Sequence, residues 1–198
     1  MLMFVNTKSK VFMMTGGRLV LHIIGSYMTL VVAFLTIFAA WRFGNWRDWR
    51  KYYPTILFTV IVNFLITILT YNHSLWHFEK TLFIPNHVLA DIFMKFLNYP
   101  AIVLLYLSRY PYNSRLLKQL TYLISWVVVF SLIEWMFVCT KITTYHNGWN
   151  IWWSIIVWIF MFIGFRIHHT RPLWAWLLCF VGTAFLIFYF HLPITKLK

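Results

Sequence analysis

Long apolar segments recur along this chain, and they constrain its fold more than any other feature. A helix needs about 20 apolar residues to cross the hydrocarbon core of a bilayer. Six segments meet this requirement, near 19–41, 54–71, 87–108, 119–139, 149–167 and 172–191. Only 11% of the 198 residues are charged, whereas a soluble domain carries about a quarter. The sequence therefore predicts one integral membrane domain, 1–198, folded as an all-α polytopic transmembrane helix bundle of about six spans.

The third segment is the least regular of the six. Asp91, Lys95, Asn98 and Pro100 interrupt its apolar run, so five spans remain if this segment is re-entrant. In the segment before it, Pro54 suits the first turn of a helix. The first segment is too long for the apolar part of a signal peptide and has no convincing cleavage site, so we expect it to be retained.

The basic residues predict the orientation in the membrane. Nine lie in the connectors 42–53, 109–118 and 166–172, whereas the alternate connectors hold only Lys80 and Lys141. By the positive-inside rule, the basic connectors are cytoplasmic and both termini lie outside. The basic N-terminal tail opposes this, unless the true start is Met13 or Met14. We expect the basic connectors to meet anionic lipid headgroups and not nucleic acid, because no basic stripe stands on a soluble module.

Tryptophans cluster where the fifth segment begins. Trp149, Trp152 and Trp153 stand at i, i+3 and i+4, a spacing that predicts one shared helix face. Tryptophan rings favour the boundary between lipid and water, which indicates an aromatic belt at the interface. The alternative is an aromatic cage that binds a ligand.

Familiar catalytic and cofactor motifs are missing from the sequence. It contains no GxSxG, no HExxH, no glycine-rich phosphate loop and no HxE with a CxxC. Cys139 and Cys179 lie far apart in apolar runs, without metal-ligand spacing. We expect Ser125, Ser131 and Ser154 to bond their own helix backbone or a neighbouring helix. No catalytic residue, metal or cofactor is therefore predicted.

Ionisable residues within the apolar segments are the most informative polar groups. Placing a charge in the bilayer costs about 2.5–3.5 kcal/mol on insertion scales. Glu134 lies within the fourth segment, and Asp91 and Lys95 are four residues apart, so they can neutralise one another on a helix face. Asn63 lies in the middle of the second segment, where an interhelical hydrogen bond is expected.

The predicted orientation gathers polar residues into one outer layer, to which His22 and His191 also belong. The layer also contains His73, His77, Glu79, His87, Asp91, Glu134 and His146. Together with Asn63 and Lys95, which lie inside predicted spans, these seven residues are the candidate polar or ligand-binding site. Imidazole and carboxylate together suit zinc, iron or manganese, and such a layer could also relay protons or bind a polar ligand. His73 and His77 could share a helix face, which is a weak metal signal. The alternative is that these residues favour wet loops and that Glu134 pairs with a basic group.

Five stretches form an ordered set of motifs: RDWRKYYPTILF (47–58), LTYNHSLWHFEK (69–80), NYPAIVLLYLSRYP (98–111), SLIEWMF around Glu134, and YHNGWNIWWS (145–154). In their order they resemble a family of small multi-pass membrane proteins of spore-forming Firmicutes that has no assigned activity. The resemblance covers about residues 47 to 170. It implies a helical protein of a bacterial plasma membrane, with a link to spores or germination, and it supplies no reaction.

Three functions follow from these observations. The first is a non-enzymatic structural or accessory membrane protein, with a membrane-protein partner or a second copy of the chain. The second is a small transporter or channel component, in which Asn63, Asp91, Lys95 and Glu134 line a polar path. The third is a membrane enzyme built on the outer histidine and carboxylate layer. The sequence favours the first.

Cysteine labelling in intact cells tests the predicted orientation. With Cys139 and Cys179 replaced, we expect an impermeant maleimide to label single cysteines at Ser74 and Asn147 but not at Ser114. The first two positions lie in connectors predicted to be outside, and the third lies in a basic connector. The opposite labelling would reverse the orientation and place the polar layer in the cytoplasm.

Overall fold

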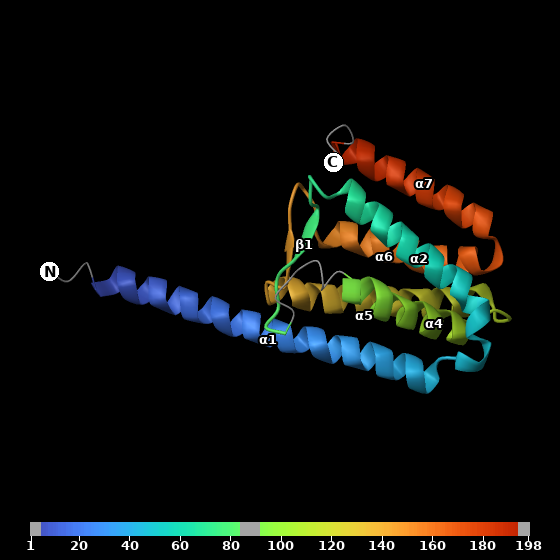
Figure 1. Ribbon diagram of the computed structural model, residues 1–198, viewed down its shortest axis with the longest axis horizontal. Helices are drawn as coiled ribbons and strands as arrows, with labels where there is room; N and C mark the ends of the chain where they lie inside the picture. Colours follow the sequence, from blue (N-terminus) through green and yellow to red (C-terminus); the bar gives the residue numbers. More distant parts are fainter. Residues whose placement is uncertain (1–4, 84–91, 194–198) are drawn as a thin grey trace.

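The computed structural model describes residues 5–83 and 92–193 and shows the expected all-α helix bundle (Figure 1). The helices are α1 (Val5–Phe43), α2 (Trp49–Leu69), α4 (Tyr99–Arg109), α5 (Leu116–Cys139), α6 (Ile151–Thr170) and α7 (Pro172–Tyr189). A short 3₁₀ turn, η1 (Trp46–Asp48), precedes α2, and a π-helical turn, η2 (Met94–Asn98), precedes α4. Two short strands, β1 (Trp76–Phe78) and β2 (Thr143–Tyr145), complete the described structure.

Five of these helices are long and apolar enough to cross a membrane. They correspond to Leu19–Phe43, Trp46–Leu69, Leu116–Cys139, Ile151–Thr170 and Pro172–Tyr189. The third predicted segment is described from residue 92 onward, where a helix passes through the π-helical turn η2 into the 11-residue α4 and ends at Arg109. The protein is thus a membrane protein whose described residues contain five candidate spans.

The short helix α4 forms the centre of the bundle. It contacts α1, α2 and α6, and six of its 11 residues are buried. Tyr106 is fully buried, and its ring packs against Phe162 of α6 with the ring centroids 4.9 Å apart. By contrast, Ala175 is the only buried residue recorded for α7. The apolar side chains of the outer helices therefore face the surroundings, as expected when lipid takes the place of water.

A small antiparallel sheet covers one end of the bundle (Figure 1). In it, Trp76 of β1 lies opposite Tyr145 of β2, and the Trp76 ring contacts the ring of Trp149 with centroids 4.9 Å apart. The expected helix face shared by His73 and His77 is therefore wrong. His77 lies in β1, paired with Thr144, because the strand pairing supplies backbone partners after α2 ends.

Two helix boundaries differ from the sequence prediction. Pro54 lies inside α2, because η1 leads directly into a helix that begins at Trp49. Trp149 precedes α6, because the Asn150 side chain caps that helix by accepting hydrogen bonds from two backbone N–H groups. As a result Trp149 is buried, whereas Trp152 is 72% exposed. The expected single face of three tryptophans is wrong.

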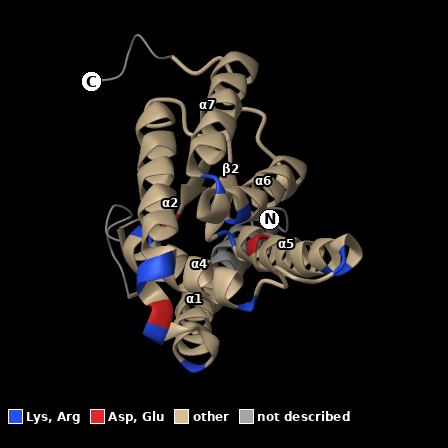
Figure 2. Cartoon of the chain, turned by 90° about the vertical axis from the view of Figure 1, so that its right-hand side faces the viewer, with Lys and Arg blue, Asp and Glu red and all other residues tan. Residues whose placement is uncertain are grey.

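The three basic connectors meet at the opposite end of the bundle. They join α1 to α2, α4 to α5, and α6 to α7, and all three turns lie at the right of Figure 1. Figure 2 shows this end with the Lys and Arg positions spread over it. The structure therefore brings together the residues on which the predicted orientation depends. Which side of a membrane this end faces stays a prediction.

A close approach at Gly25 tests the packing of α1. A Cβ at this position would lie 2.4 Å from Ile142 Cγ1 and 2.8 Å from Thr140 Oγ1, and both residues are buried. We expect Gly25→Ala to lower the free energy of unfolding by about 1–3 kcal/mol through overpacking. Thermal unfolding in detergent measures the change.

Gly182→Ala in α7 is the matched control. Nothing lies within 4 Å of a Cβ added there, so we expect an unchanged or slightly higher unfolding temperature. Equal behaviour of the two variants would contradict the tight contact between α1 and residues 140–142.

Candidate functional site

Glu134 of α5 lies at the centre of a hydrogen-bond network between three elements. Its Oε1 accepts hydrogen bonds from Tyr145 Oη (2.8 Å) and Ser154 Oγ (2.5 Å). Its Oε2 accepts one from Trp158 Nε1 (2.6 Å). Tyr145 belongs to β2, and Ser154 and Trp158 stand one turn apart on α6. The carboxylate thus links β2 and α6 to α5 through hydrogen bonds.

The network continues beyond the carboxylate. Trp149 Nε1 donates to Ser154 Oγ at 3.0 Å, so the serine hydroxyl accepts from the indole and donates to Glu134. Burial, with a further contribution from Glu134, raises the pKa of the Tyr145 hydroxyl above its usual range, although Ser154 lowers it. Tyr145 therefore stays protonated and keeps donating. The arrangement is suited to holding elements together, and it pairs the serine with no histidine base.

The expected pairing of Glu134 with a basic group is wrong for the described part of the chain. The partners are neutral donors from a tyrosine, a serine and a tryptophan. Hydrogen bonds to a charged form stabilise it without the cost of burying a second charge. Sequence reasoning selected Glu134 but missed its partners. The four-residue spacing of Ser154 and Trp158, which places them on one helix face, was the signal that could have indicated two of them.

The other serines behave partly as expected. Ser125 Oγ donates to the backbone carbonyl of Tyr122 in its own helix. Ser154 joins another helix through Glu134. The hydroxyl of Ser131 is buried and has no hydrogen-bond partner among the described residues.

Several described residues of the predicted outer layer lie in or beside the sheet, but the structure does not bring them into one cluster. His146 Nε2 lies 3.0 Å from Thr144 Oγ1, and His22 Nε2 lies 2.6 Å from the carbonyl oxygen of Lys80. The backbone N–H of Glu79 donates to Ile142 O at 2.8 Å, which extends the pairing beyond the sheet. His73 lies in the turn that follows α2.

A metal centre is not assembled by residues 5–83 and 92–193. Within these ranges no three side chains of the His, Cys, Asp and Glu types lie close enough together to hold a metal ion. Two of the predicted layer residues, His87 and Asp91, lie outside the described residues. The expected pairing of Asp91 with Lys95 therefore stays a prediction.

Lys95 is a charged side chain buried within the bundle. It lies in the π-helical turn η2, is 2% exposed, and donates from Nζ to Thr67 Oγ1 of α2 at 2.7 Å. The same amine lies 4.5 Å from the centroid of the Phe64 ring, where a cation is attracted to the ring face. Turns of this kind interrupt helices frequently at functional sites. Lys95 is thus the second candidate position for function.

Asn63 contributes to the same helix but not as expected. Its Nδ2 donates to the carbonyl of Thr59, one turn earlier in α2, at 2.8 Å. The interhelical hydrogen bond predicted for Asn63 is therefore wrong within the described structure. A bond to a free carbonyl lone pair of its own helix satisfies the amide without requiring a partner on another helix.

Comparisons with known proteins add no information about this site. No family model, no curated protein and no solved structure matches the chain. The resemblance to a Firmicutes membrane family stays a prediction.

Substitution of Glu134 tests the network. In Glu134→Gln, an amide nitrogen replaces one acceptor oxygen, so a buried donor such as Trp158 Nε1 loses its partner. We expect a loss of about 1–3 kcal/mol in unfolding free energy. Thermal unfolding midpoints in detergent provide the measurement.

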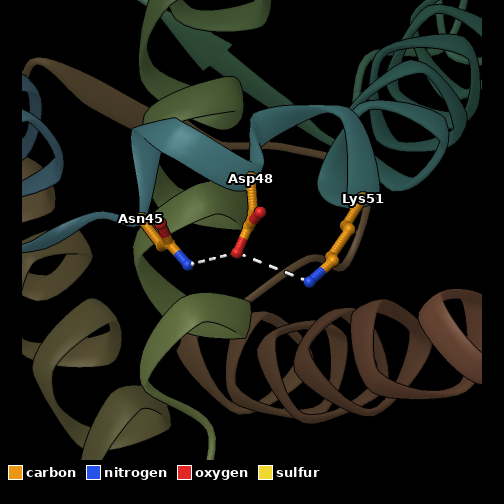
Figure 3. A network of polar contacts seen from close by, with 3 residues as sticks. All are labelled: Asn45, Asp48 and Lys51. Atoms are coloured by element: carbon orange, nitrogen blue, oxygen red, sulfur yellow. Dashed lines mark hydrogen bonds and ion pairs between the residues drawn. The ribbon is translucent and has the colours of Figure 1, made fainter.

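Asp48→Asn is the control for this substitution. Asp48 Oδ2 accepts from Asn45 at 2.9 Å and lies 3.4 Å from Lys51 Nζ on the exposed turn η1 (Figure 3). Surface pairs of this kind contribute about 0–1 kcal/mol, so a small change is expected. Equal shifts in both variants would remove the special role assigned to Glu134.

Proposed function

We propose that this protein is a non-enzymatic integral membrane protein with a structural or accessory role. The observation that carries the proposal is how the charges of Glu134 and Lys95 are used within the bundle. Glu134 joins α5 to β2 and α6, and Lys95 joins η2 to α2. Each charge is engaged in contacts between elements, and the Glu134 carboxylate is occupied on both of its oxygens.

Transport is the second candidate, and the surroundings of Lys95 favour it. The buried amine lies in a π-helical turn that interrupts the helix leading into α4. Transporters often bind substrates or ions where a membrane helix is broken near the middle of the bilayer. A polar substrate moving past η2 would meet the amine of Lys95.

The cellular setting is part of the proposal. Nine basic residues at one end support a cytoplasmic position for that end, in contact with anionic lipid headgroups. The plasma membrane of a spore-forming bacterium, and a role in spores or germination, rest on the sequence resemblance alone. Deletion of the gene in such a host, followed by measurement of growth and germination, supplies a phenotype with which to test the role.

Complementation of that phenotype separates the structural role from transport. In a structural role, both charges hold elements of the fold together. We therefore expect the degree to which Glu134→Gln and Lys95→Met complement the deletion to follow the amount of folded protein. Fluorescence-detected size-exclusion chromatography measures the folded amount in each strain.

Lys95→Arg is the matched variant, since it keeps the charge but changes the geometry at Thr67. The structural role would be contradicted if Lys95→Met folded to the wild-type amount and yet failed to complement. That outcome, with partial rescue by Lys95→Arg, would favour transport.

A further inference from the structure

The end of the bundle that carries the basic connectors has far more positive than negative charge. Nine basic residues lie in its three connectors, and Asp48 is the single acid there. Asp48 is engaged by Asn45 and Lys51 (Figure 3). Several of the basic side chains are therefore without an acidic partner in the described structure, and Arg166 is the one that contacts two tyrosine rings.

Arg166 lies beside two tyrosine rings near the end of α6. Its guanidinium carbon is 4.7 Å from the centroid of the Tyr112 ring and 5.2 Å from that of Tyr110. Its Nη1 donates to Thr170 Oγ1 at 3.0 Å. Rings that stack on a guanidinium hold its plane, while the N–H donors at its edge stay directed outward. Such an edge matches the oxygens of a phosphate or carboxylate.

Two tyrosine hydroxyls beside Arg166 are buried and have no hydrogen-bond partner among the described residues. They belong to Tyr106 and Tyr112. Burial raises the pKa of Tyr112 to about 12 in spite of the nearby Arg166, so this hydroxyl carries its proton at neutral pH. A buried hydroxyl without a partner carries a desolvation cost that a bound acceptor would remove.

A histidine and a lysine adjoin these rings. The His169 ring lies 5.8 Å from the Tyr112 ring and 5.4 Å from the Tyr52 ring, measured between centroids. Lys51, the neighbour of Tyr52 in the chain, and Arg166 both lie within electrostatic range of His169. His168, in contrast, forms a buried hydrogen bond with Thr55, in which Nδ1 lies 3.0 Å from Oγ1.

We infer that Arg166, Tyr112, His169 and Lys51 form a binding site for a phosphate group. The guanidinium edge supplies paired N–H donors, Tyr112 supplies a protonated hydroxyl, and the His169 ring adds an N–H donor. Lys51, which also pairs with Asp48, adds positive charge. The phosphate belongs either to an anionic phospholipid headgroup or to a soluble phosphate. The lipid source rests on the proposed membrane orientation, since Arg166 lies one turn before the end of a candidate span.

Lipid retention measured by native mass spectrometry tests the site. The purified full-length protein is transferred from vesicles of phosphatidylcholine with or without phosphatidylglycerol, and bound lipids are counted. We expect Arg166→Gln to retain phosphatidylglycerol roughly tenfold less, as for the loss of hydrogen bonds to a charged group. Tyr112→Phe should lose about threefold, because one neutral donor is removed.

Arg115→Gln is the matched control. It removes one exposed positive charge at the same end of the bundle, from a side chain that makes no cap hydrogen bond. We expect its retention of phosphatidylglycerol to match the wild type. Equal losses in Arg166→Gln and Arg115→Gln would overturn the site and leave only the diffuse attraction of a basic surface. No preference for phosphatidylglycerol in the wild type would overturn the lipid source and the proposed headgroup contact together.

Addition of inorganic phosphate tests the soluble source of the ligand. A rise in the unfolding temperature of wild type in phosphatidylcholine vesicles, absent in Arg166→Gln, supports a soluble phosphate ligand. If neither phosphatidylglycerol nor inorganic phosphate distinguishes the two proteins, the inference is wrong. Arg166→Lys, which keeps the charge without the planar fork, replaces Arg166→Gln if the latter does not fold.

Discussion

A polar group in the hydrocarbon core must find its partners within the protein, because no water is present to satisfy it. The rest of this structure depends on how that constraint is met at Glu134. Tyr145, Ser154 and Trp158 all donate to its carboxylate, so the charge determines how α5, α6 and the small sheet pack together. The same constraint explains why many Ser and Thr hydroxyls donate to carbonyls one turn earlier in their own helices.

The charges of Glu134 and Lys95 illustrate different solutions to one energetic problem. Glu134 is stabilised by neutral donors, which avoids the cost of bringing a second charge out of water. Lys95 is held by a hydroxyl and by the face of an aromatic ring. Both solutions connect segments that are distant in the sequence. The proposed structural role rests on these connections, and the position of Lys95 is the basis of the second candidate, transport.

The two ends of the bundle differ in chemistry. One end is closed by a sheet and an aromatic cluster in which Trp149 packs against Trp76 and Phe190. The other carries basic connectors and a group of tyrosines around Arg166. Sequence reasoning assigned the second end to diffuse attraction of lipid headgroups. It missed the tyrosines because their rings come from α2, α4 and the connector after α4, and no short motif joins them.

Composition and hydrophobic length by themselves determined that this protein is a bundle of membrane helices, because about 20 consecutive apolar residues leave few other solutions. They also located the basic connectors and selected Glu134 as the most informative charge. Only the tertiary structure decided how polar groups are paired. Asn63 bonds its own helix, Trp149 precedes α6 instead of lying on it, and neutral donors take the place of a basic partner for Glu134. Depth in a bilayer follows from position along the chain, whereas lateral neighbours depend on how the helices pack.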